Sequence, residues 1–370
     1  MNDKYFDRRR KIQKATRKLD AFLVTNPINV RYLTGFTGGA GCLLIAPDGD
    51  TLLSDPRFTL QIEEECPGLN AVIRPRNEHV SQTLRSLLGK TTSGKLGIEA
   101  GYVTLAQKDR LFEMLQHWEA VPLQKTVEEF RQIKDKEEIA AIRKAVHIAG
   151  EAFHFIVANY FKKEIKEGID SSESDFCNFL EFIMSKEAED KSFPSIIAAG
   201  VRSALPHATP GGTIIRKQSH CIVDWGCIVN GYMSDLTRVM ILNLNDKKLR
   251  KVYETVLKAN EKAIAAIKPG KTCEEIDAVA RNIITDAGYG KHFGHGLGHS
   301  VGLQIHEDPR FAAGDKTVLK PGMVLTVEPG IYLKGWGGVR IEDDILVTKT
   351  GCEVLSKNVP KKFEEAVVTL

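Results

Sequence analysis

Hydrophobic positions in the first third of the chain recur with two different periods. Short apolar runs predict strands, and these runs lie at 21–25, 42–46 and 51–54. Stretches with helical spacing follow them, at 80–89 and 104–118. Strands combined with helices in this way are typical of an α/β domain. We therefore predict a small α/β domain over residues 1–125.

A second domain is predicted over residues 126–370, because a chain of 370 residues is long for one hydrophobic core. Its first helix is indicated by Ile139, Ile142 and Val146, which recur at helical spacing between charged residues. Another helix should start with a capping box at Thr272 and end before Gly288.

Residues 221–240 (CIVDWGCIVNGYMSDLTRVM) have the pattern of a β-hairpin around Asn230-Gly231. A two-residue turn there pairs Asp224 with Thr237 and places Asp224 and Asp235 on one face, roughly 5–8 Å apart at Cβ. They could be solvated aspartates on a surface hairpin. However, their neighbours are apolar, and two buried anions repel each other unless a cation compensates them. This favours a metal site.

The segment 292–307 (HFGHGLGHSVGLQIHE) is rich in glycine and histidine. His295 and His299 have the spacing of a zinc-binding helix, but glycines interrupt it and no glutamate follows His295. A dinucleotide-binding loop is also disfavoured, because His299 replaces the third glycine of that motif. The segment is either a loop with incidental histidines or backbone folded around something small.

A second hairpin is predicted within 324–347 (VLTVEPGIYLKGWGGVRIEDDILV). Pairing centred on Gly335 places Glu328 opposite Glu342, and a continuous strand over 339–347 carries Arg340 and Glu342 on one face. Glutamates at strand ends are usually solvated. Glu342 lies in the middle of its strand near an arginine, which indicates a compensated polar cluster.

Four carboxylates and one imidazole are thus candidate metal ligands: Asp224, Asp235, His299, Glu328 and Glu342. Such a set suits two hard divalent cations, with Mn²⁺ favoured and Co²⁺, Fe²⁺ or Zn²⁺ as possible substitutes.

These motifs resemble those of the pita-bread-fold metallopeptidases, the group of methionine aminopeptidase, aminopeptidase P, prolidase and creatinase. The matching stretches are LPHATP (205–210), VDWGCIVNGYMSDLTR (223–238), GHGLGHSVGLQIHE (294–307), TVEPGIY (326–332) and VRIEDD (339–344). The segment 23–39 is similar to the smaller domain that precedes the catalytic domain in Xaa-Pro peptidases and creatinase. The resemblance implies an α+β fold, with a C-terminal pita-bread domain after a creatinase-like N-terminal α/β domain.

The resemblance also implies the arrangement of the ligands. Asp224 and Asp235 would bind the metals, with Asp235 bridging them. His299 and Glu328 would each complete one metal, and Glu342 would be the second bridge.

Further residues match the catalytic groups of the family. His207 and His306 match substrate-contacting histidines, and His295 matches another histidine of the Xaa-Pro branch. Glu328 would also carry a proton to the leaving nitrogen. Arg340 would hold a carboxylate ligand, or alternatively bind a substrate carboxylate.

The implied function is that of an Xaa-Pro aminopeptidase, which releases the first residue from peptides with proline in second position. Two metals about 3.5–4 Å apart would bridge the attacking water or hydroxide. The alternative is a prolidase restricted to dipeptides, which needs a cation such as Arg202 or Arg340 for the free carboxylate. The complete ligand set disfavours a non-catalytic binding protein and a creatinase-like amidinohydrolase.

Composition indicates neither nucleic acid nor membrane as a partner, with a net charge of +3 and no apolar run of membrane-spanning length. The basic run 8–18 is interpreted as the solvated face of a first helix rather than a nucleic-acid arm or transit peptide. Seven cysteines without zinc spacing indicate reduced, mostly buried thiols in a cytoplasmic protein. A homodimer is expected from the resemblance alone.

Overall fold

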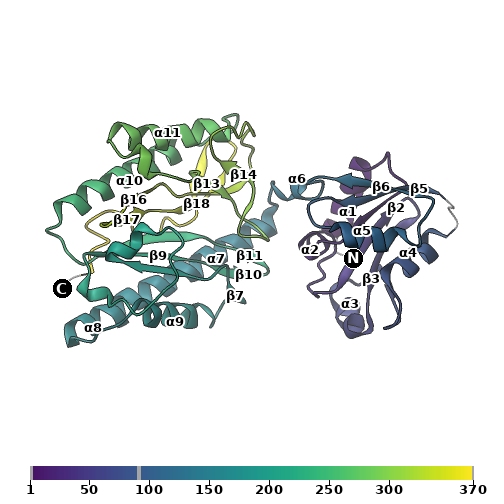
Figure 1. Ribbon diagram of the computed structural model, residues 1–370, viewed down its shortest axis with the longest axis horizontal. Helices are drawn as coiled ribbons and strands as arrows, with labels where there is room; N and C mark the ends of the chain where they lie inside the picture. Colours follow the sequence, from purple (N-terminus) through teal and green to yellow (C-terminus); the bar gives the residue numbers. More distant parts are fainter. Residues whose placement is uncertain (1–2, 90–92, 369–370) are drawn as a thin grey trace. The chain divides into compact units, whose positions relative to one another are not determined.

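A computed structural model describes residues 3–89 and 93–368 (Figure 1). The chain divides into two compact units, residues 1–131 and 132–370, rather than at the predicted 125/126. Helix α6 (Glu128–Arg131) lies between the predicted boundary and the observed one. It belongs to the first unit, to which it is hydrogen-bonded. Asn29 Nδ2 donates to Glu128 Oε1 over 2.7 Å, and Arg131 Nη1 donates to Asn29 Oδ1 over 2.7 Å.

The N-terminal unit is built on a six-stranded mixed sheet in the order β4-β3-β2-β1-β5-β6. Its strands are β1 (Ala21–Val24), β2 (Gly41–Ala46), β3 (Gly49–Ser54), β4 (Asn70–Ile73), β5 (Gly94–Glu99) and β6 (Trp118–Leu123). Its other helices are α1 (Asp3–Ala15), α2 (Pro27–Thr34), α3 (Thr59–Glu65), α4 (Val80–Leu88), α5 (Leu105–Phe112) and the 3-10 turn η1 (Pro56–Phe58). The three predicted strands and the helix at 80–89 are confirmed. The helix predicted to reach residue 118 ends at Phe112, because Trp118 pairs with Gly94 as the start of β6.

The basic run forms a helix as predicted, but its interpretation as a solvated face is wrong for two of its arginines. Arg8 and Arg9 are both 7% exposed. Arg8 Nη1 donates to Tyr32 O over 2.9 Å, and Arg9 Nε donates to Asp50 Oδ2 over 2.9 Å. The fold buries these guanidinium groups because backbone carbonyls and a carboxylate satisfy their donors.

The C-terminal unit places short sheets between two layers of helices (Figure 1). One layer holds α7 (Lys136–Phe155), α8 (Lys162–Glu167) and α9 (Glu173–Met184), and the other holds α10 (Lys247–Ala266) and α11 (Cys273–Asp286). Shorter helical turns are η2 (Ile156–Phe161), η3 (Gly200–Ala204), η4 (Ile215–Lys217) and η5 (Gly290–His292). The two helices predicted in this part are confirmed. Thr272 caps α11 by accepting from Glu275 N.

Four sheets form the middle of this unit. They have the orders β11-β10-β7, β12-β9-β8, β14-β13-β15-β18-β19 and β16-β17. The strands are β7 (Asp190–Lys191), β8 (Ile196–Ala199), β9 (His220–Trp225), β10 (Cys227–Val229), β11 (Tyr232–Met233), β12 (Leu236–Ile241), β13 (Gly298–Ser300), β14 (Glu307–Phe311), β15 (Val324–Val327), β16 (Gly330–Leu333), β17 (Gly337–Arg340), β18 (Asp343–Val347) and β19 (Cys352–Val354).

Alternate residues of β9 and β12 pack against the two helical layers. Val223 and Leu236 belong to the core that includes α7 and α9, whereas Ile222 and Val239 belong to the core that includes α10 and α11. Side chains of a strand alternate between faces, so Asp224 lies on the same face as Ile222. A carboxylate is thereby placed on an otherwise apolar face inside the unit.

The predicted register of the first hairpin is confirmed. Asn230 (φ 51°) and Gly231 (φ 80°) both have positive φ, as a two-residue type I′ turn requires. Val229 pairs with Tyr232, and Thr237 pairs with Asp224.

The second hairpin also has the predicted register, because Leu333 pairs with Gly337 and Val327 with Asp343. The expected continuous strand over 339–347 is wrong at Ile341 and Glu342. There the chain leaves β17, and Glu342 bridges to Thr237 of β12 before β18 begins. This crossing brings Glu342 to the sheet that carries Asp224.

All seven cysteines are free, six of them buried and Cys352 half-buried, in agreement with the prediction of reduced thiols. Within residues 3–89 and 93–368, no helix has both the length and the apolar character that crossing a bilayer requires.

Candidate active site

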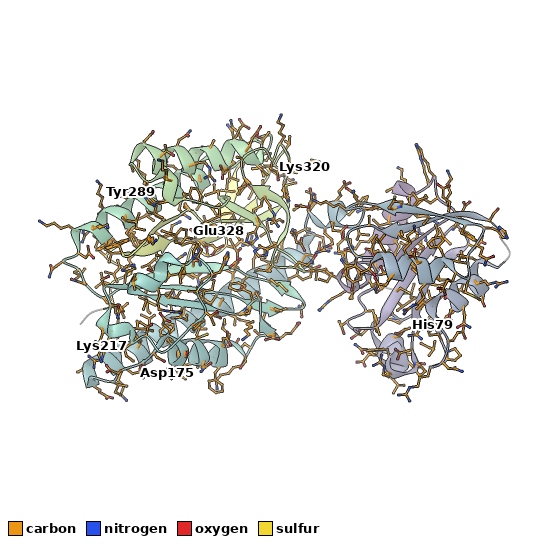
Figure 2. The ribbon with its side chains drawn as sticks, in the orientation of Figure 1. His79, Asp175, Lys217, Tyr289, Lys320 and Glu328 are labelled. Atoms are coloured by element: carbon orange, nitrogen blue, oxygen red, sulfur yellow. The ribbon has the colours of Figure 1, made fainter. Side chains whose placement is uncertain are left out.

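A cavity of about 620 Å³ in the C-terminal unit gathers every residue that the sequence singled out as catalytic or metal-binding. Glu328, labelled in Figure 2, lies among the central strands of this unit. The predicted residues that line the cavity are His207, Asp224, Asp235, His295, His299, His306, Glu328, Arg340 and Glu342.

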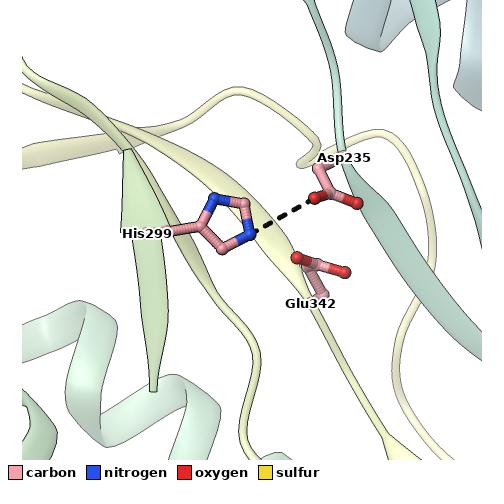
Figure 3. Close-up of side chains that lie close together, drawn as sticks. All are labelled: Asp235, His299 and Glu342. Carbon is pink, nitrogen blue, oxygen red and sulfur yellow. Dashed lines mark ion pairs between the residues drawn. The ribbon is translucent and has the colours of Figure 1, made fainter. Parts of the chain in front are cut away.

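Three of these side chains form a compact group with the geometry of a metal site. Ligand atoms of Asp235, His299 and Glu342 all lie within 4.8 Å of one another (Figure 3). His299 Nε2 is 3.5 Å from Asp235 Oδ2 and 3.5 Å from Glu328 Oε1. Three separate elements supply the group, since His299 is on β13, Asp235 precedes β12 and Glu342 lies between β17 and β18.

The His299 ring is oriented for ligation. Its Nδ1 is 3.2 Å from Ser300 O, so the proton is on Nδ1 and the Nε2 lone pair faces the carboxylates. Burial, and then the neighbouring His306, lowers the pKa of His299 to about 3. A neutral imidazole with a free Nε2 is the form that binds a metal ion.

The carboxylates repel one another at the centre of the cavity. Burial raises the pKa of Asp235 well above its ordinary value, and Glu342 and Asp224 raise it further. Burial likewise raises the pKa of Glu328 to about 8. Among the described residues, the buried Oδ1 of Asp224 has no hydrogen-bond partner. Excess negative charge, oxygen donors and an unpartnered carboxylate oxygen together fit divalent cations.

Arg340 contacts Asp224, one of the predicted ligands, rather than open space. It is 3% exposed, its Nη2 donates to Asp224 Oδ2 over 2.5 Å, and its Nε donates to Thr237 Oγ1 over 3.0 Å. Thr237 Oγ1 in turn donates to Glu342 Oε2 over 2.6 Å. Thr237 was not predicted as a site residue, although the predicted register placed it directly opposite Asp224.

A second chain of hydrogen bonds leads from Arg340 to His295. Arg340 Nη1 lies 2.9 Å from Tyr332 Oη, which lies 3.0 Å from His295 Nε2. His295 Nδ1 is 2.8 Å from Gly296 O. Because Arg340 and His295 Nδ1 donate, the Tyr332 hydroxyl must donate to His295 Nε2. Tyr332 was not predicted as a site residue either, although it lies in the TVEPGIY motif.

The remaining predicted residues differ in position. His207 and His306 are exposed to the cavity, and the ring centroid of His306 is 4.4 Å from that of His299. Arg202 is not part of the cavity lining, because its Nε donates to Glu173 Oε2 over 2.9 Å. Arg310, which was not predicted as a site residue, lines the cavity from β14.

Comparison with known proteins identifies the family. Residues 140–349 match metallopeptidase family M24, and residues 8–133 match the creatinase/prolidase N-terminal domain. The chain belongs to metallopeptidase family M24. The predicted resemblance and the α+β fold, a creatinase-type N-terminal domain followed by a pita-bread domain, are thereby confirmed.

Individual members of family M24 match nearly the full length of the chain. It is 36% identical over 340 residues to an Xaa-Pro dipeptidase of Pyrococcus furiosus, covering 92% of this chain and 94% of that one. The structure of an Xaa-Pro dipeptidase from Bacillus anthracis matches with a TM-score of 0.88 at 36% identity, over 97% of this chain and 99% of the other. An X-Pro aminopeptidase from Thermotoga maritima matches with a TM-score of 0.86 at 30% identity, over 97% and 100%.

The metal-free M24 chain should become more stable as the pH falls from 8.5 to about 7. Burial and repulsion raise the pKa values of Asp235, Glu328 and Glu342, so the folded chain binds protons in this range that the unfolded chain does not. The free energy of unfolding therefore decreases as the pH rises towards and beyond the pKa of Glu328, about 8. Thermal unfolding in EDTA across this range measures the slope.

The manganese-loaded protein is the control, because bound cations keep the same carboxylates deprotonated. Its melting temperature should decrease less, because only the buried thiols, whose pKa values are also raised in the folded chain, still contribute to the decrease. The measurement stays above pH 7 because histidines of the unfolded chain, with a pKa of about 6.5, take up protons below pH 7. That uptake stabilises the unfolded chain and opposes the effect of the carboxylates. A decrease from pH 7 to 8.5 that is no larger in the metal-free protein than in the manganese-loaded protein would contradict the prediction.

Proposed function

We propose that the protein is a metal-dependent Xaa-Pro dipeptidase, a prolidase, rather than the Xaa-Pro aminopeptidase that the sequence analysis favoured. Its relatives from Pyrococcus furiosus and Bacillus anthracis, each 36% identical, both carry the name Xaa-Pro dipeptidase. The observation that carries the proposal is the position of Arg310 in the cavity.

A dipeptidase must bind the free carboxylate that directly follows the scissile bond, so its cavity needs an available cation. Arg310 is exposed, and its charge lowers the pKa values of both His299 and His306 after the larger effect of burial. Its guanidinium forms no ion pair with any described residue. Arg340 and Arg202, the two arginines that the sequence suggested, are instead bound to Asp224 and Glu173.

We further propose that Asp224, Asp235, His299, Glu328 and Glu342 hold two divalent cations, with Asp235 and Glu342 shared between them. Only one ligand is a nitrogen donor, which favours Mn²⁺. When bound, the cations supply Lewis acidity and lower the pKa of a water molecule.

The protein's own groups would then orient the substrate and move the proton. Arg310 binds the proline carboxylate, while His207 and His306 contact the peptide from the cavity wall. The prolyl nitrogen must be protonated as its bond breaks, and Glu328 is the group that carries this proton. The Tyr332–Arg340 contact and the Thr237 hydroxyl keep the ligands Asp224 and Glu342 in place.

Hydrolysis of Ala-Pro and Ala-Pro-Ala by the manganese-loaded protein tests this function. We expect Ala-Pro to have the higher kcat/KM. Replacing Arg310 with glutamine should lower kcat/KM for Ala-Pro by about 10- to 100-fold, mainly through KM, because a charge-assisted hydrogen bond of about 1.5–3 kcal/mol is lost. The tripeptide, whose carboxylate lies one residue further away, should be affected less.

Arg76→Gln is the matched control, because Arg76 is an exposed arginine outside the cavity lining. This variant should change kcat/KM for neither substrate. A preference for Ala-Pro-Ala would identify an aminopeptidase, the second candidate, which the X-Pro aminopeptidase of Thermotoga maritima supports with a TM-score of 0.86. The homodimer and the cytoplasmic location stay predictions.

A further inference from the structure

The N-terminal unit contains a cavity of its own, of about 290 Å³, remote in sequence from the peptidase motifs. It lies where β2 and β3 meet α4 and α5, and His79, labelled in Figure 2, is on its wall. The charged or titratable residues of its lining are Arg74, His79, Arg110 and Cys42. Among the described residues that line it, none is an aspartate or glutamate.

The cavity is therefore electropositive. Arg74 is fixed by donating from Nη1 to Glu78 O over 2.7 Å, and neither Arg74 nor Arg110 forms an ion pair with a described residue. Val80 and Ser81, in the first turn of α4, also line the cavity, so the positive end of this nine-residue helix faces it. Two unpaired guanidinium groups and a helix N-terminus favour an anion.

Ser81 supplies an independent indication of a ligand. The residue is only 5% exposed, yet its hydroxyl forms no hydrogen bond with any described residue. In contrast, the hydroxyl of Ser54, on the same wall, donates to Ala40 O. The Ser81 oxygen is not one of the fully enclosed polar atoms that lack a partner, so it is accessible from the cavity and can donate a hydrogen bond to a ligand there.

Leu53, Val80, Val103 and Leu111 give the wall an apolar part, and Thr25 and Gln107 add two uncharged polar side chains. Burial raises the pKa of Cys42 to about 12, so this thiol is neutral and adds to the apolar surface. A volume of about 290 Å³ is enough for a compact organic molecule but too small for a folded segment.

We propose that this cavity is a binding site for a small organic anion. A carboxylate or phosphate group contacts Arg74, Arg110 and the Ser81 hydroxyl, and a compact apolar body packs against Leu53 and Leu111. This site is separate from the peptidase cavity and does not depend on the proposed dipeptidase activity.

Calorimetric titration of the full chain with sodium butyrate, butanamide and inorganic phosphate tests the site. Butyrate should bind, whereas butanamide, which has the same apolar body without the charge, should not. Arg110→Gln should weaken butyrate binding by about tenfold, because one charge-assisted hydrogen bond is lost. Arg110 is an exposed residue of α5, so this variant should fold normally.

Arg85→Gln is the control, because Arg85 is exposed on α4 but outside the lining. Butyrate binding that is unaffected by Arg110→Gln but weakened by Arg310→Gln would place butyrate in the peptidase cavity. That result would overturn the proposal. Equal binding of butanamide and butyrate would also overturn the proposal. So would the absence of binding by both anions at about 20 mM, a concentration roughly 20-fold above a millimolar Kd. Tighter binding of phosphate than of butyrate would assign a phosphate ester as the ligand class.

Discussion

Replacing Asp235 with asparagine should remove bound metal and lower dipeptide hydrolysis by at least about 10³-fold. Asp235 contributes an oxygen to the group with His299 and Glu342, in which all ligand atoms lie within 4.8 Å. Without its charge, a cation would lose a ligand in the middle of the site. Metal analysis after manganese loading, together with Ala-Pro hydrolysis, measures both effects.

The same variant should not unfold the metal-free protein. Glu342 and Asp224 raise the pKa of Asp235, in addition to the effect of burial, so a neutral asparagine relieves repulsion among buried carboxylates. The melting temperature in EDTA should therefore equal or exceed that of the unmodified chain. This separates loss of metal from loss of structure.

The exposed histidines of the cavity provide the contrast. His207→Ala and His306→Ala should reduce turnover while manganese content stays close to that of the unmodified protein, because neither belongs to the compact ligand group. An Asp235→Asn variant that retained its metal and its activity would remove the basis for the assigned ligands. Loss of metal from His306→Ala would instead place that imidazole in the site.

The parts of this site that could be predicted from the sequence depend on local geometry. The turn at Asn230-Gly231 fixes the register of its hairpin, and the register decides that Asp224 pairs with Thr237. The loop centred on Gly335 fixes its own hairpin in the same way. Alternation along β9 then places Asp224 on the face of the cavity, whereas Asp235, Glu328 and Glu342 lie outside the strands, where alternation alone could not place them.

Contacts between elements that are distant in sequence could not be predicted in this way. The hydrogen bond from Thr237 to Glu342 spans 105 residues and depends on how β12 meets the link between β17 and β18. Arg310 was overlooked because nothing in its local sequence distinguishes a cavity arginine from a surface one. Arg8 and Arg9 were misinterpreted for the same reason, since only tertiary packing supplies the carbonyls and the Asp50 carboxylate that bind them.

Replacing Arg238 with methionine should destabilise the C-terminal unit by about 3–5 kcal/mol, because it leaves a buried charge without its main partner. Arg238 and Asp343 are 2% and 1% exposed at their side chains, and Arg238 Nη2 is 2.9 Å from Asp343 Oδ1. Arg238 also donates to Val359 O over 2.8 Å, to Thr237 O over 2.9 Å and to Glu342 O over 2.5 Å, so three buried carbonyls lose a donor. Methionine fills similar space, which limits the effect of a cavity.

Urea unfolding of the unmodified protein, Arg238→Met and Arg250→Met measures this effect. Arg250 is the control, because its ion pairs with Glu254 and Glu364 are on the surface, where such pairs contribute little. The Arg250 variant should unfold at nearly the same urea concentration as the unmodified chain.

The pH dependence of the Arg238→Met effect identifies its cause. Burial alone would raise the pKa of Asp343, but Arg238 and Lys361 hold it well below its ordinary value. The ion pair therefore stabilises the fold fully above the pKa of an aspartate in the unfolded chain, about 3.9. This stabilisation is lost as the pH falls through the lower pKa that Asp343 has in the folded chain. In the variant the pKa of Asp343 should rise, so the deficit in unfolding free energy should be full at pH 7 and shrink below about pH 5. A deficit of equal size at pH 7 and pH 4 would instead attribute the loss to the packing and hydrogen bonds of the arginine.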